Sequence, residues 1–143
     1  MKNFCCATGV MAIFLALAVP PAQSQETPSA LNCEFKEGTA TSYEGGVFKS
    51  KAPQPLSFAI EGIDLEGQKA VLKTGEGAGG KLSIVRAINA NHFIEAVNEG
   101  FLNLTTVYDK DPATGRYPAV HSRHFGILGQ PVTGQYTGTC QAR

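Results

Sequence analysis

The chain has 143 residues, and its 12 lysine and arginine residues balance 12 aspartate and glutamate residues, so the formal net charge at pH 7 is zero. No segment is strongly basic, which argues against nucleic acid or an anionic membrane surface as a partner. The 16 glycines and the absence of tryptophan favour a turn-rich β protein over a helical one.

Residues 1–24 have the features of a secretory signal peptide. Lys2 supplies a positive start, residues 5–19 are apolar and uncharged, and Ala22 and Ser24 place small side chains where a signal peptidase cleaves. The apolar run is shorter than the roughly 18 to 20 residues of a membrane-spanning helix. We therefore predict cleavage after Ser24, no membrane span afterwards, and a secreted or periplasmic protein.

Cleavage would leave two cysteines, Cys33 and Cys140, near opposite ends of the chain. In an exported protein such a pair predicts one structural disulfide. The chain-entropy model gives a closed loop of about 100 residues roughly 4 to 5 kcal/mol of stabilisation. A redox pair is the less favoured alternative, because redox cysteines are usually close together as Cys-x-x-Cys.

The remaining chain is long enough for one domain with a modest core. We expect residues 25–31, which are polar and contain a proline, to be a flexible lead-in to a single β domain at residues 32–143. The first strand candidate covers residues 31–43, with Cys33 and Phe35 facing the same way.

Residues 49–55 are basic and contain prolines, so we expect a connection that contributes nothing to the core. Residues 56–60 and 69–74 alternate apolar and polar side chains, which predicts a hairpin. The glycine-rich segment that follows, residues 75–80, matches a dinucleotide-binding pattern, but residues 82–85 favour a strand where that motif needs a helix. We predict a hairpin tip and no nucleotide or other cofactor.

The segment at residues 82–97 has two interpretations. Apolar residues recur at helical spacing from Leu82 to Ile88, and a Glu-Gly pair follows that could end a helix. We favour two strands joined by a turn at residues 89–91, because the segment is rich in β-branched isoleucine and valine.

Residues 93–125 carry the strongest strand signal, with three runs of aromatic and β-branched residues. Turn-forming residues at 98–100 and 111–115 separate these runs and predict a three-stranded antiparallel meander. A loop with an apolar tip is expected at residues 126–131, and a short final strand at residues 135–140.

These elements predict an all-β domain, a small antiparallel meander barrel or sandwich of about seven or eight strands. The predicted disulfide would bring the terminal strands side by side and help to close a barrel. A small exported chain of many short strands with its ends joined by a disulfide resembles calycin-type barrels and the small periplasmic barrels that inhibit lysozymes or proteases. The resemblance is one of architecture; it implies a binding role and assigns no site residue.

Catalytic and metal-binding patterns fail on spacing. His121 and His124 are three residues apart, so in one strand they point to opposite faces. Ser122 and His124 share a face but lie about 6 to 7 Å apart along a strand, too far for a nucleophile and its base. We expect no catalytic residue and no metal site. A metal-dependent enzyme that uses His92, His121 and His124 remains an alternative.

Arg123 is the main candidate for a binding surface, since arginine and aromatic residues are frequent at binding hot spots. His121, His124 and Phe125 flank it in the sequence, and Ile127 and Leu128 form the apolar loop beyond. We predict a non-catalytic binding or interaction module, inhibitor-like, with an unknown extracytoplasmic protein as its partner. The alternative is a small-ligand carrier with a partly empty barrel interior.

Overall fold

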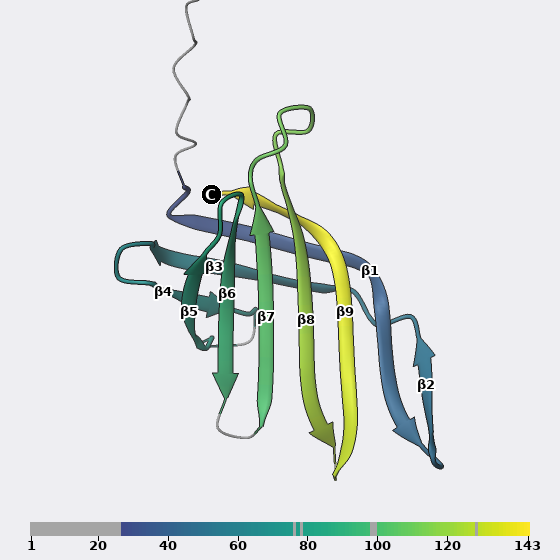
Figure 1. The fold of residues 1–143 in the computed structure, drawn as a ribbon. Coiled ribbons are helices and arrows are strands. Elements are labelled where there is room, and N and C mark those ends of the chain that lie inside the picture. The colour runs from purple at the N-terminus through teal and green to yellow at the C-terminus, as the bar shows by residue number, and fades with distance from the viewer. Residues whose placement is uncertain (1–26, 76, 78, 98–99, 128) are drawn as a thin grey trace, which may run out of the picture.

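The computed structural model describes residues 27–75, 77, 79–97, 100–127 and 129–143. These residues form nine antiparallel strands and no helix (Figure 1). The strands are β1 (Ala30–Glu44), β2 (Val47–Lys51), β3 (Leu56–Asp64), β4 (Lys69–Lys73), β5 (Lys81–Arg86), β6 (Ala90–Val97), β7 (Phe101–Tyr108), β8 (Tyr117–Ile127) and β9 (Gln130–Ala142). Within this part of the chain, no helix is long and apolar enough to cross a membrane.

The strands form a closed barrel with one additional strand, which confirms the prediction of a small all-β barrel. The sheet order is β2-β1-β3-β4-β5-β6-β7-β8-β9, and β1 also pairs with β9. Eight strands therefore close the barrel, and β2 extends the sheet along the second half of β1. Figure 1 shows β6 to β9 side by side, with β3 crossing their direction.

Strand β1 closes the barrel because it pairs with three other strands. Its first half pairs with β3 and its second half with β2, while β9 follows it along most of its length. A bulge lies between Phe35 and Glu37, and bulges bend a strand and increase its twist. Gly138 of β9 makes this bend fit, since a Cβ atom there would collide with the carbonyl oxygen of Glu34.

Cys33 and Cys140 form the predicted disulfide. They are directly opposite each other in the register of β1 and β9, so the bond joins the two strands that close the barrel. Both cysteines are fully buried beside Phe35, which stacks on Phe58 with 5.4 Å between ring centroids. The disulfide is thus part of the core, whose other members include Leu31, Ile60, Ala70, Leu82, Ile84, Phe93, Val107, Ala119 and Tyr136.

Several strand predictions are confirmed. Residues 82–97 form two strands, β5 and β6, and not a helix. Strands β6, β7 and β8 form the predicted meander. In the turn before β8, both carboxylate oxygens of Asp111 accept hydrogen bonds, one from the Ala113 amide and one from the Thr114 hydroxyl. These bonds lower the pKa of Asp111, with that from Thr114 contributing most.

Other boundaries differ from the prediction. Residues 49–51 belong to β2, whose five side chains are all exposed, so it lacks the apolar alternation that reveals a strand. The expected loop at residues 126–131 is mostly strand, because β8 and β9 pair as far as Ile127 and Gln130. Strand β9 is longer than residues 135–140, since backbone pairing with β8 and β1 supports it on both sides.

The start of the domain also differs from the expected boundary. Residues 1–24 lie outside the described residues, so the signal peptide stays a prediction. Strand β1 begins at Ala30, inside the segment expected to be a flexible lead-in. Leu31 is already a core residue, only 2% exposed.

Candidate functional site

A row of three polar side chains crosses the inner face of the barrel. Glu95 on β6 is directly opposite Asn103 on β7, and Asn103 is directly opposite Arg123 on β8. We call Glu95, Asn103 and Arg123 the polar row. It lies on the same face as Phe93 and His121, because residues two apart in a strand point to the same side.

His121 lies one row deeper and is 4% exposed. Its Nδ1 is 2.8 Å from the hydroxyl oxygen of Thr105, the residue opposite it on β7. Its ring contacts those of Phe35, Phe58 and Tyr136. Burial, with a smaller effect of the nearby positive charge of Arg123, lowers the pKa of His121 to about 4. The imidazole is therefore neutral at neutral pH.

An aromatic pair lies on the other side of the polar row. Phe101 of β7 and Phe125 of β8 stack with 5.3 Å between their ring centroids. The guanidinium carbon of Arg123 lies 5.8 Å from the centroid of the Phe125 ring, within the range of a cation–π contact. Arg123 is thus held between a buried histidine and a stacked aromatic pair.

The polar row forms one wall of a pocket inside the barrel, which we call the barrel pocket. Its volume is about 290 Å³ and it is partly open to solvent. Leu56, Phe58 and Leu72 contribute apolar side chains from β3 and β4. The other lining residues are Thr74, Gly79, Gly80, Glu95, Asn103, His121 and Arg123.

Glu95 and Asn103 hold each other in place. Glu95 is 7% exposed, and its carboxylate accepts a 2.7 Å hydrogen bond from Nδ2 of Asn103. The glycine at position 80 leaves room for this carboxylate, since a Cβ atom there would collide with Oε1 of Glu95.

Two polar groups of the row have unused hydrogen-bonding capacity. The Oδ1 atom of Asn103 is buried and has no hydrogen-bond partner among the described residues. Arg123 contacts the Phe125 ring but makes no hydrogen bond or ion pair to any part of the chain that the structure describes. A buried acceptor without a partner costs about 1 to 3 kcal/mol, which makes Asn103 an unusual residue in this part of the barrel.

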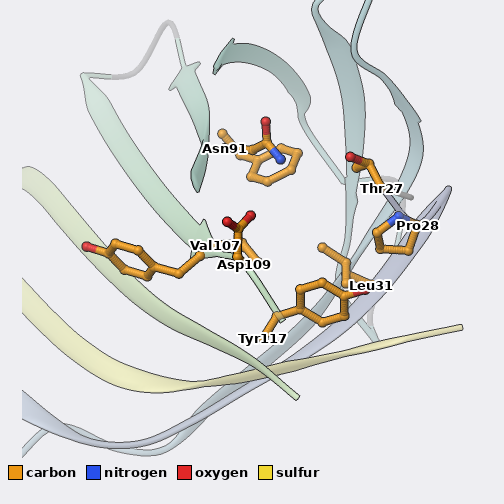
Figure 2. Close-up of a pocket in the computed structure, with 9 residues that line it drawn as sticks. Thr27, Pro28, Leu31, Asn91, Val107, Asp109 and Tyr117 are labelled. Atoms are coloured by element: carbon orange, nitrogen blue, oxygen red, sulfur yellow. The ribbon is translucent and has the colours of Figure 1, made fainter. Parts of the chain in front are cut away.

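The opposite end of the barrel has a much smaller cavity, of about 30 Å³. Figure 2 shows Leu31, Val107, Asp109 and Tyr117 around it, with Thr27 and Pro28 at its edge. A space of this size holds one or two water molecules, so it is too small for an organic ligand.

The predicted surface group around Arg123 is divided by the strand. His121, Arg123 and Phe125 face the barrel interior, as their contacts with Phe35, Phe58 and Phe101 show, whereas His124 is exposed on the opposite face. These candidates therefore lie on two faces of the barrel wall, because neighbouring residues of a strand alternate sides. Ile127 ends β8 and its side chain is not described; Leu128 lies outside the described residues.

The structure does not bring the three histidines together. His92 is opposite Thr106 and bonds to its hydroxyl at 2.9 Å, whereas His121 bonds to Thr105. Because Thr105 and Thr106 are adjacent in β7, the two imidazoles lie on opposite faces. No group of three His, Cys, Asp or Glu side chains able to hold a metal occurs in the described ranges.

Sequence reasoning missed Glu95, Asn103 and Gly80 as site residues. Glu95 did carry a signal, since it shares a face with the apolar Phe93 two residues earlier in a predicted strand. A charged residue on the buried face of a strand is unusual and indicates a functional or paired group. Asn103 and Gly80 carried none, because only the strand register brings them to Glu95.

Comparisons with models of protein families, with curated proteins and with solved structures found no match to this chain.

Proposed function

We propose that this protein is an exported, non-catalytic β-barrel that binds a small molecule in the barrel pocket. The observation that carries the proposal is the pairing of two unlike walls across one cavity. Leu56, Phe58 and Leu72 line one side, and the polar row, with the Arg123 cation and the Glu95 carboxylate, lines the other. Ligand sites combine mainly apolar walls with a few placed polar groups in this way.

The size of the pocket favours a small molecule. Its volume of about 290 Å³ is at the lower end of the roughly 300 to 1,000 Å³ found for ligand sites. The aromatic and arginine side chains expected to contact a protein, Phe125 and Arg123, are half-buried on the inner face of the barrel. This placement favours a small ligand over an inhibitor-like protein contact.

The properties of His121 support binding over acid–base catalysis. A general base works best when its pKa is near the pH of the reaction, and burial holds the pKa of His121 at about 4. A neutral, buried imidazole bonded to Thr105 instead provides a fixed wall for a ligand.

The proposed location is outside the cytoplasm, in the periplasm or secreted. The predicted signal peptide at residues 1–24 supports it. The disulfide between Cys33 and Cys140 is compatible with it, because such bonds persist in oxidising compartments.

The test compares a tryptophan that fills the pocket with a control tryptophan on the outer face of the same strand, β4. Leu72→Trp would occupy the pocket, whereas Val71→Trp changes the neighbouring side chain, which is 37% exposed. Binding of a fragment library to the unmodified protein and to both variants would be measured by NMR, with backbone amide shifts locating the fragments. We expect fragments to shift amides around the pocket in the unmodified protein and in Val71→Trp, but not in Leu72→Trp.

A thermal unfolding curve for each variant would establish that it is folded. The proposal is refuted if no fragment shifts amides around the pocket of the unmodified protein. Equal binding to both folded variants would refute it as well.

A further inference from the structure

We propose that the barrel pocket is specific for a small zwitterion with an apolar side chain, namely a single hydrophobic α-amino acid. This inference rests on the proposed function and adds the chemical class of the ligand. The polar row offers a cation at one end and acceptors at the other, so its two ends match the two charged groups of such a molecule.

Arg123 is the group that would hold the carboxylate. Its guanidinium makes no hydrogen bond or ion pair within the described ranges, and guanidinium groups bind carboxylates through two parallel hydrogen bonds. The ring of Phe125, which stacks on Phe101, contacts it on the side away from His121. The guanidinium therefore has its hydrogen-bond donors available for a ligand.

Glu95 and Asn103 would hold the ammonium group. Nδ2 of Asn103 is already bonded to Glu95, which leaves its buried Oδ1 as an acceptor without a partner in the described structure. An ammonium group has three donors and no acceptor. It can therefore bond to the Glu95 carboxylate, which Asn103 holds in place, and its positive charge compensates the negative one.

The spacing of the row fits an α-amino acid. Neighbouring strands lie about 4.8 Å apart, so the backbones of Glu95 and Arg123, two strands apart, are separated by roughly 10 Å. The two side chains leave the sheet on the same face, so their charged groups face a gap of this order, reduced by one hydrogen bond at each end. The ammonium and carboxylate of an α-amino acid are bonded to the same carbon atom, which suits this gap.

The opposite wall would select the side chain. Leu56, Phe58 and Leu72 face the polar row across the pocket, and they favour an apolar group over a charged one. The volume of about 290 Å³ is about twice the roughly 150 Å³ of a cavity that holds benzene. It accommodates one hydrophobic amino acid.

Ligands with only one charge fit the row less well. An anion would pair with Arg123 but lie close to the Glu95 carboxylate, which repels it. A cation would pair with Glu95 but leave the guanidinium without an acceptor. Only a molecule with both charges satisfies both ends.

The test is calorimetric titration of the exported, purified protein with leucine and with phenylalanine. N-acetylleucine, which lacks the ammonium charge, and leucinamide, which lacks the carboxylate, are the matched analogues. We expect the free amino acids to bind, and each analogue to bind at least about tenfold more weakly, since each loses charge-assisted hydrogen bonds.

Two variants assign the ends of the row. Glu95→Gln should lower the affinity for leucine at least about tenfold and leave the affinity for N-acetylleucine nearly unchanged. Arg123→Gln should also lower the affinity for leucine at least about tenfold, but leave the affinity for leucinamide nearly unchanged. Glu66→Gln and Arg86→Gln, at exposed positions outside the pocket, are the controls and should bind leucine like the unmodified protein. Thermal unfolding would confirm that each variant is folded.

The outcomes separate this inference from the proposed function. If fragments bind in the pocket but leucine and phenylalanine do not, or if the analogues bind as tightly as leucine, the proposed specificity for a zwitterion is wrong. The proposal that the pocket binds a small molecule is then still supported. If no compound binds in the pocket, both fail.

Discussion

Replacing His121 by asparagine is expected to remove much of the acid sensitivity of this protein. The asparagine side chain is shorter than histidine but can still bond to the Thr105 hydroxyl that His121 Nδ1 contacts at 2.8 Å. Unlike histidine, it does not titrate. The comparison therefore isolates the cost of protonating a buried imidazole.

The magnitude follows from the lowered pKa. In the unfolded chain His121 binds a proton near its ordinary pKa of 6.5, whereas in the folded protein burial lowers the pKa to about 4. Between these values the unfolded state binds more protons, so stability falls as the pH falls. Each pH unit is equivalent to about 1.4 kcal/mol, and the total loss is therefore roughly 3 kcal/mol. It is absent above pH 6.5 and complete below pH 4.

Urea unfolding of both proteins from pH 8 to pH 4 measures this difference. Carboxylates whose pKa values are lowered, such as those of Asp64 and Asp111, also reduce the stability of the protein in acid. Both proteins contain them, so their contribution cancels in the comparison. We expect the unmodified protein to lose roughly 3 kcal/mol more than His121→Asn over this range. Parallel pH profiles, or an NMR titration of His121 near pH 6.5, would show that the imidazole is not held neutral by burial.

Two further predictions concern the closure of the barrel. Replacing both Cys33 and Cys140 by serine should lower the free energy of unfolding by about 4 to 5 kcal/mol, because their disulfide closes a loop across a sequence separation of 107 residues; chemical denaturation measures this, and a loss below about 1 kcal/mol would contradict it. Gly138→Ala should lower the free energy of unfolding by several kcal/mol, since its Cβ atom would collide with the carbonyl oxygen of Glu34. Gly126→Ala is the control, because a Cβ atom there meets its nearest neighbour only at 3.8 Å. Equal melting temperatures for the two variants would refute the close approach of β1 and β9.

The sequence by itself determined most of the strands and the bond between the first and last of them, but not β2 or the full length of β9. Apolar and polar residues alternate at residues 56–60 and 93–125, and this period is compatible only with strands that bury one face. Cys33 and Cys140 were the two cysteines left after the predicted cleavage, so their pairing required no knowledge of the fold. Arg123, His121 and Phe125 were identifiable as candidates because their side chains are typical of binding sites.

Only the tertiary structure decided how those candidates form a site. Glu95, Asn103 and Arg123 belong to three different strands, and they become neighbours because the registers of β6, β7 and β8 place them directly opposite one another. Alternation shows which residues share a face of one strand, but it does not show which residue of the next strand lies alongside. Register and barrel closure depend on backbone hydrogen bonds and on the packing of the whole core, and these interactions join residues that are distant in the sequence.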